Sequence, residues 1–216
     1  MAVKVKAKVK FSSFDYVGTY SEPAFEPIRM FAAINPLYRA LKAWNVSPQD
    51  VKYGAGLSTS EPLISIQLAK THYTVNVGLA SFGFKATFVA WDQAPIIIEI
   101  INSASTALAG ALNMTLVEHN LTIVMQLAIE GKSIGDLTRH LSMPLGYPAA
   151  DTDFYGFLLY SKDGSLYTVD KSAADPDDLF VRIVRKYGVG HSMDEMAKGM
   201  YESEQGLAQA LGIEIE

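Results

Sequence analysis

The chain contains no cysteine among its 216 residues. This absence excludes disulfide bonds, thiol catalysis, iron–sulfur clusters and zinc sites built on thiolates. It is compatible with a cytoplasmic location, which we take as the expected one. The first residues also lack the apolar core of a signal peptide, which favours the same expectation.

Charge is scarce and mildly negative. Only 19% of the residues are charged, the formal net charge is -5, and the isoelectric point is near 5.4. A general nucleic-acid-binding protein needs a basic field to contact phosphates, so the composition argues against that class. The exception is a set of four lysines near the start of the chain, Lys4, Lys6, Lys8 and Lys10. They alternate with apolar residues, which is typical of the solvated face of a half-buried strand. We interpret these lysines as that solvated face, on a strand whose charges protect a sheet edge.

No stretch of the sequence is typical of a membrane span. The most apolar segment, residues 96–112, is interrupted by polar side chains such as Glu99 and Asn102. It is also shorter than the roughly 20 apolar residues that a span requires. We expect a buried core helix there, and no membrane span.

Motifs that carry chemistry are missing. The four histidines are too dispersed to share one site on a helix; they are His72, His119, His140 and His191. No phosphate-binding loop and no serine nucleophile elbow occurs. Acidic residues gather in two regions without the spacing of a calcium loop: Asp151, Asp153 and Asp170, and Asp175, Asp177 and Asp178. We interpret these clusters as turns, because aspartate readily bonds to its own backbone. The sequence therefore predicts no catalytic residue, no metal site and no cofactor.

Hydrophobic residues make up 49% of the chain, enough to bury a sizeable core. Residues 63–68, 73–77 and 83–89 predict a strand meander with a hairpin turn at 70–72. A helix follows at 96–112, with Asp92 as its N-cap and Pro95 in its first turn. Before the meander we expect a strand at 4–14, an irregular connection at 16–25, and a helix that opens at Pro27, with a kink or a break near Asn35 caused by Pro36.

After this helix we expect a strand at 116–130, a short helix at 133–141 and a linker at 144–150. Strands at 154–160, 166–169 and 179–186 follow, with a hairpin at Asp163-Gly164. The last helix covers 193–211 and opens with a capping box formed by Ser192 and Glu195. The predicted class is α+β, an antiparallel meander with helices packed on one face, with a possible pseudo-duplication of a strand-strand-strand-helix unit. We assign units 1–143 and 151–216, packed as one globular body.

Aromatic residues follow one predicted strand: Phe82, Phe84, Phe88 and Trp91. Phe82, Phe84 and Phe88 share one face by the alternation of a strand. Most such residues belong to a core. The alternative is an apolar groove between sheet and helix that accepts a partner's peptide, with these four residues as candidate binding residues.

The meander at 63–89, the Trp91-Asp92 entry to a helix and the later strand and helix at 179–211 resemble SecB-like proteins. In particular, they look like an uncharacterised bacterial family of that superfamily. The resemblance implies a non-enzymatic binding protein, since SecB itself is an oligomeric chaperone that holds unfolded chains. It implies a role for no individual residue.

Three functions follow from these observations. The first is a protein- or peptide-binding protein, chaperone-like or an interaction module, that self-associates as a homo-oligomer. The second is an enzyme or small-ligand carrier with a pocket between sheet and helix, using dispersed residues such as His119, Asp153 and Tyr155. The third is a structural subunit of a larger assembly.

Overall fold

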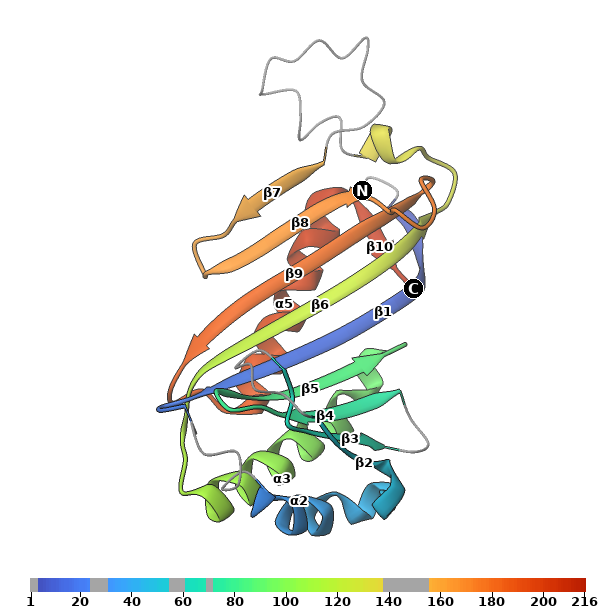
Figure 1. Ribbon diagram of the computed structural model, residues 1–216. Helices are drawn as coiled ribbons and strands as arrows, with labels where there is room; N and C mark the ends of the chain where they lie inside the picture. Colours follow the sequence, from blue (N-terminus) through green and yellow to red (C-terminus); the bar gives the residue numbers. More distant parts are fainter. Residues whose placement is uncertain (1–3, 24–30, 55–60, 69–71, 138–155) are drawn as a thin grey trace. The chain divides into compact units, whose positions relative to one another are not determined.

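The computed structural model describes residues 4–23, 31–54, 61–68, 72–137 and 156–216. Within these ranges, ten strands form one sheet in the order β2-β3-β4-β5-β1-β6-β9-β8-β7, with β10 beside β1. The chain belongs to the α+β class, with helices packed against a largely antiparallel sheet, as the sequence predicts (Figure 1). The predicted linker at 144–150 lies outside the described residues.

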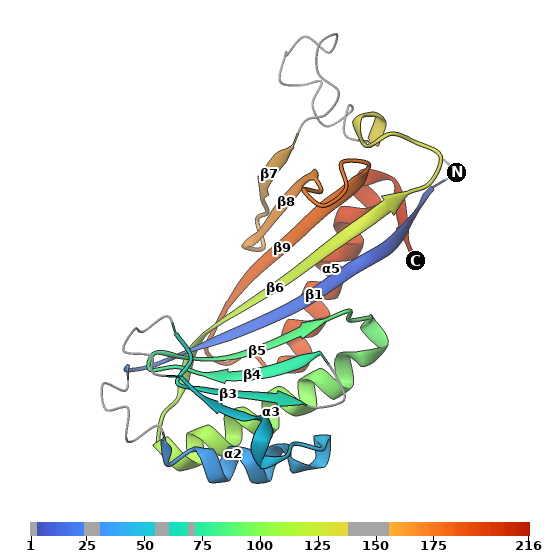
Figure 2. The same ribbon diagram turned by 45° about the vertical axis from the view of Figure 1, so that its right-hand side comes forward.

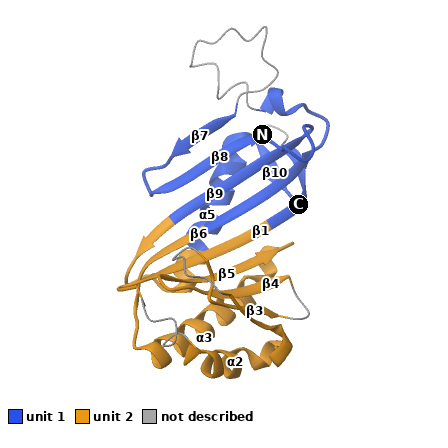
Figure 3. Ribbon diagram, in the orientation of Figure 1, with its two compact units in different colours: residues 1–12, 122–185, 198–216 blue, residues 13–121, 186–197 orange. Residues whose placement is uncertain are grey.

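The chain forms two compact units that are interleaved along the sequence. One contains residues 1–12, 122–185 and 198–216, and the other contains residues 13–121 and 186–197 (Figure 3). Three strands and the last helix contribute residues to both units. The predicted division into 1–143 and 151–216 stays a prediction.

The second of these units is built on the meander. It contains β2 (Val51–Tyr53), β3 (Ile64–Leu68), β4 (Tyr73–Val77) and β5 (Ser81–Thr87), each antiparallel to the next. β5 also pairs with the second half of β1 (Val5–Tyr20), with Tyr16 opposite Phe84. Alternate residues of β3, β4 and β5 are buried, because successive side chains of a strand point to opposite faces.

The helices α2 (Ile34–Leu41) and α3 (Ala94–Leu112) belong to this unit. α3 buries one stripe of side chains at helical spacing: Ile97, Ile100, Ile101, Ala104, Leu108 and Leu112. It ends where Asn113 takes a left-handed conformation, with φ of 51°. Within the described ranges, the helical stretch 91–112 is the one long and apolar enough to cross a membrane by length and composition.

The other unit contains most of β6 (Leu116–Ile129) and β9 (Asp178–Gly188), and all of β7 (Phe157–Tyr160), β8 (Ser165–Lys171) and β10 (Ile213–Ile215). Residues 198–211 of α5 (Met193–Leu211) complete it. The β7–β8 hairpin turns at Asp163-Gly164, as predicted, and Gly164 has a positive φ of 84° that favours glycine.

Several predicted elements need correction at their ends. β1 continues to Tyr20, through the first part of the predicted irregular connection. β5 ends at Thr87 because Phe88 has a φ of 57°, so Phe88 leaves the predicted same-face register. The predicted interruption near Asn35 is present as a break: Ala32 and Ala33 form a turn between helical Phe31 and α2. Pro36 lies in the first turn of α2, where a missing amide proton has little effect.

Asp92 is not the N-cap of α3. It lies inside the 3-10 turn η3 (Trp91–Gln93), and α3 starts from Gln93 without a side-chain cap. The lysines of β1 are exposed, as predicted, but the edge role is wrong, because the segment that carries them pairs with β10 through Val5–Ala7 and β6 is the next strand in the sheet order. Strands β2 and β10, and the 3-10 turns η1 (Lys42–Trp44) and η2 (Pro48–Asp50), were not predicted.

The capping box of α5 is confirmed. The Ser192 hydroxyl accepts a hydrogen bond from the Glu195 amide at 3.2 Å, and the Glu195 carboxylate accepts one from the Ser192 amide at 2.8 Å. The Ser192 amide, together with the Ser192 hydroxyl that also donates to the carboxylate at 3.0 Å, holds the pKa of Glu195 below its usual value, since both bonds stabilise the ionised form.

Replacing the N-cap serine tests this assignment. We expect Ser192→Ala to lower the free energy of unfolding by about 1 kcal/mol, because an amide of the first turn loses its acceptor. Denaturant titration followed by circular dichroism measures the change. Ser105→Ala, within α3, is the control and should cause no loss, since alanine is the better helix former. Equal losses in both variants would contradict the capping role.

Candidate binding surfaces

Strand β7 is an edge strand that exposes apolar side chains. Among the described residues it pairs with β8 alone, and it ends the sheet order (Figures 1 and 2). Its four residues are Phe157, Leu158, Leu159 and Tyr160, and none carries a charge. Leu158 is 53% exposed, Leu159 46% and Tyr160 78%. Such an edge presents unpaired backbone groups and an apolar surface together.

The register of the hairpin shows which backbone groups face outward. The amide of Ser161 donates to the carbonyl of Ser165 at 2.8 Å, so these two residues form a hydrogen-bonded pair. Such pairs alternate along an antiparallel ladder, so Leu159 also bonds toward β8. The amide and carbonyl groups of Leu158 and Tyr160 therefore point away from β8, toward the open side of β7.

Both faces of the edge are apolar. The Ser165 side chain contacts Ser203 of α5 at 3.2 Å, so the face of β8 that carries Ser165 is the helix side. Residues directly opposite each other in the register share a face, which places Leu159 on the helix side. Leu158 and Tyr160 lie on the other side.

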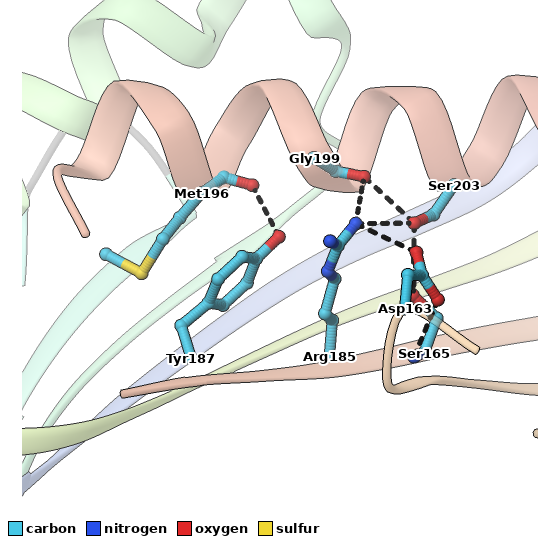
Figure 4. A network of polar contacts seen from close by, with 7 residues as sticks. All are labelled: Asp163, Ser165, Arg185, Tyr187, Met196, Gly199 and Ser203. Carbon is cyan, nitrogen blue, oxygen red and sulfur yellow. Dashed lines mark hydrogen bonds and ion pairs between the residues drawn. The ribbon is translucent and has the colours of Figure 1, made fainter. Parts of the chain in front are cut away.

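A polar network fixes the hairpin turn to α5. Arg185 Nη1 lies 3.0 Å from an oxygen of the Asp163 carboxylate and donates to the carbonyl of Gly199 at 3.1 Å (Figure 4). The same nitrogen lies 3.4 Å from the hydroxyl of Ser203, and Asp163 accepts from the amide of Ser165 at 3.0 Å. Partial burial opposes ionisation of Asp163, but these hydrogen bonds and the guanidinium outweigh it and lower the pKa of the carboxyl. These contacts hold the turn that presents β7 against α5.

The four aromatic candidates separate into two pairs. Phe82 and Phe84 are buried in the core, at 0% and 1% exposure. Phe88 is 61% exposed and its ring lies 5.6 Å from that of His72, in an edge-to-face arrangement. Trp91 is half-buried in η3. Phe88 and Trp91 are therefore the members of this group that lie outside the core.

The histidines do not assemble into a catalytic site among the described residues. His119 forms a hydrogen bond through Nδ1 with the hydroxyl of Tyr16 at 2.8 Å. Burial, followed by the charge of His191, lowers the pKa of His119, and burial raises the pKa of Tyr16. Because its pKa is raised, the Tyr16 hydroxyl is a poor acid near neutral pH. His140, Asp153 and Tyr155 lie outside the described residues.

The described acidic clusters are used in structural contacts. Lys10 Nζ lies 3.1 Å from Asp175 and 2.8 Å from Asp178, and Gln126 also donates to Asp178 at 2.6 Å. Bonding to Lys10 lowers the pKa of Asp175, because it stabilises the ionised form. Among the described residues, no group of three or more histidine, aspartate or glutamate side chains is placed to hold a metal.

A cavity of about 270 Å³ lies between α3 and the strands of the meander unit. It is lined without charged residues by Tyr20, Phe82, Ser105, Thr106, Leu108, Ala109, Met114, Thr115 and Leu116. The hydroxyl of Tyr20 is buried without a hydrogen-bond partner among the described residues. Because a cavity of roughly 150 Å³ holds one benzene ring, this one has room for a small, neutral molecule.

No protein-family model and no curated protein matches this chain. The fold and the geometry of the surfaces therefore carry the functional argument. Of the surfaces described, the β7 edge was not singled out by the sequence, although its uncharged run Phe157-Leu158-Leu159-Tyr160 next to a hairpin was a visible signal.

Removing the anchor of the hairpin turn tests its structural role. We expect Arg185→Met to lower the free energy of unfolding by about 1–3 kcal/mol, because the buried Gly199 carbonyl loses a charged donor and the ion pair with Asp163 is removed. Arg182→Met, on the same strand with an exposed side chain, is the matched control and should change stability by less than about 0.5 kcal/mol. Urea titration of both variants distinguishes them, and similar effects would argue against a special role for Arg185.

Proposed function

We propose that this chain is a non-enzymatic protein-binding protein that takes an extended apolar segment of another polypeptide onto β7 by strand addition. The observation that carries the proposal is the outer side of β7, where the amides and carbonyls of Leu158 and Tyr160 face away from β8. A partner strand bonds to such groups through its own backbone, and its side chains contact the apolar residues beside them.

The two ends of the sheet order differ in a way that favours β7. Edge strand β2 has three residues and includes the exposed Lys52, and both features disfavour pairing with another chain. β7 has neither a charge nor a proline. The contrast supports selective binding at one edge.

The polar contacts of the hairpin turn also favour binding. An edge that is already ordered loses less conformational entropy when a partner strand adds to it. The contacts of Arg185 with Asp163 and with α5 provide this order at the turn. The resemblance to SecB-like proteins points to the same class of function, a non-enzymatic binding protein.

A second candidate is a small-ligand carrier, which the cavity between α3 and the meander strands favours. The cavity has an apolar lining and the unpaired hydroxyl of Tyr20, features of small-molecule sites. A structural subunit of a larger assembly would use the same β7 edge as a permanent contact. A cytoplasmic location belongs to the proposal as well.

A proline scan of the edge tests strand addition. Leu158→Pro removes an outward amide donor but leaves the bonds between β7 and β8 in place. We expect it to weaken, at least tenfold, binding of a fluorescein-labelled peptide of alternating valine and threonine, measured by fluorescence anisotropy. Leu158→Ala keeps the amide and should weaken binding less.

The matched control is Tyr53→Pro on β2. The amide of Gly54 donates to the carbonyl of Leu63 at 2.9 Å, so it points toward β3. By alternation the amide of Tyr53 points away from β3, as the amide of Leu158 points away from β8. This variant should bind the peptide as the parent protein does. Equal loss in both proline variants, or no binding by the parent, would count against the proposal.

A further inference from the structure

We infer that the polypeptide added at β7 is the β7 strand of a second copy of this chain, forming a two-fold symmetric dimer. This inference rests on the proposed strand addition at β7 and names its partner. A strand can pair with its own copy in an antiparallel arrangement, which is the pairing that a two-fold axis in the middle of the strand produces.

Hydrogen bonding restricts the register of this pairing. The outward groups of Leu158 and Tyr160 must face outward groups of the second strand to form bonds. Placing the axis at Leu159 pairs Leu158 with Tyr160 of the other protomer, and the reverse. Leu158 then lies beside the Tyr160 ring of the second copy, an aliphatic–aromatic cross-strand pair that stabilises a sheet.

Charge selects the same register. With the axis at Leu159, Lys162 of one protomer lies opposite Gly156 of the other. The carboxylate of Asp170 extends over Gly156 in its own protomer, since an added Cβ at that glycine would lie 3.0 Å from an Asp170 oxygen. The backbones of Lys162 and the second copy's Asp170 are then about two strand spacings, roughly 10 Å, apart. Two extended side chains span that distance, and both are exposed for it.

Moving the axis to Leu158 would lose this match. Lys162 would then lie opposite position 154, away from Asp170. Within one protomer the two charges cannot meet, because Lys162 is at the turn and Asp170 pairs near the far end of the hairpin. The complementary charges are thus placed for a contact between copies.

Single cysteines test the register directly, because the chain has no cysteine of its own. Leu159→Cys places two thiols at a pair that lacks cross-strand hydrogen bonds, where the Cα atoms are about 4.5 Å apart, within the range of a disulfide. Leu158→Cys places its two copies roughly 8 Å apart, from the strand rise and spacing, which is too far. Oxidation with glutathione disulfide followed by non-reducing electrophoresis should give at least fivefold more dimer for Leu159→Cys.

Charge exchange gives a second readout that does not depend on oxidation. Lys162→Glu should shift the monomer–dimer equilibrium toward monomer by severalfold in light scattering behind size exclusion. Adding Asp170→Lys to the same chain should restore the dimer, since the two charges exchange places across the interface. If Lys162→Glu lowers the fraction of dimer and the added Asp170→Lys does not restore it, the proposed register is wrong.

The outcomes separate this inference from the proposed function. Preferential linking of Leu158→Cys, or equal linking of both variants, would overturn the dimer as described. A monomer at all concentrations that still binds the valine–threonine peptide would overturn self-pairing and leave strand addition intact. A monomer that binds no peptide would overturn both.

Discussion

Pairing of backbone hydrogen-bonding groups is the constraint on which this structure depends. Each residue of a sheet presents an amide and a carbonyl that must bond to a neighbouring strand or to water. Inside the sheet order each strand has neighbours on two sides. At β7 the pairing among the described residues stops, although the side chains there are apolar and include no charge. That combination makes β7 the point where another strand can add.

The residues around β7 make its edge a defined surface. Arg185 connects the turn residue Asp163 to the carbonyl of Gly199, so the hairpin and α5 share one polar network. Ser165 and Ser203 extend that network into the interior, where both are buried. Because these groups satisfy one another, the network fixes the hairpin without leaving polar atoms unpaired. Order in the hairpin is what strand addition and self-pairing both require.

Local signals in the sequence predicted much of the architecture. Alternation identified β3, β4 and β6, and the Ser192–Glu195 capping box located the start of α5. The shorter strands β2 and β10 escaped prediction because three residues carry too little periodicity. The position of Phe88 also escaped it, because its left-handed backbone conformation has no local signal in a bulky residue.

The candidate surface was harder to predict than the fold. Phe82 and Phe84 satisfy the pattern of an apolar binding face but are core residues, and a one-strand pattern cannot distinguish the two. The importance of Leu158 and Tyr160 depends on β7 being last in the sheet order, which is a property of the whole topology. Sequence identified the strand and its turn, and only the three-dimensional arrangement identified its open side.

Amide hydrogen exchange along β7, followed by NMR, tests the central claim most directly. If the outer side of β7 is open, the amides of Leu158 and Tyr160 exchange fast in dilute protein while that of Leu159 is protected. The two fast amides then become protected as the protein concentration rises or as the valine–threonine peptide is added. Protection of Leu158 and Tyr160 in dilute protein, unchanged by either addition, would show that the chain itself already covers this edge and would contradict the account.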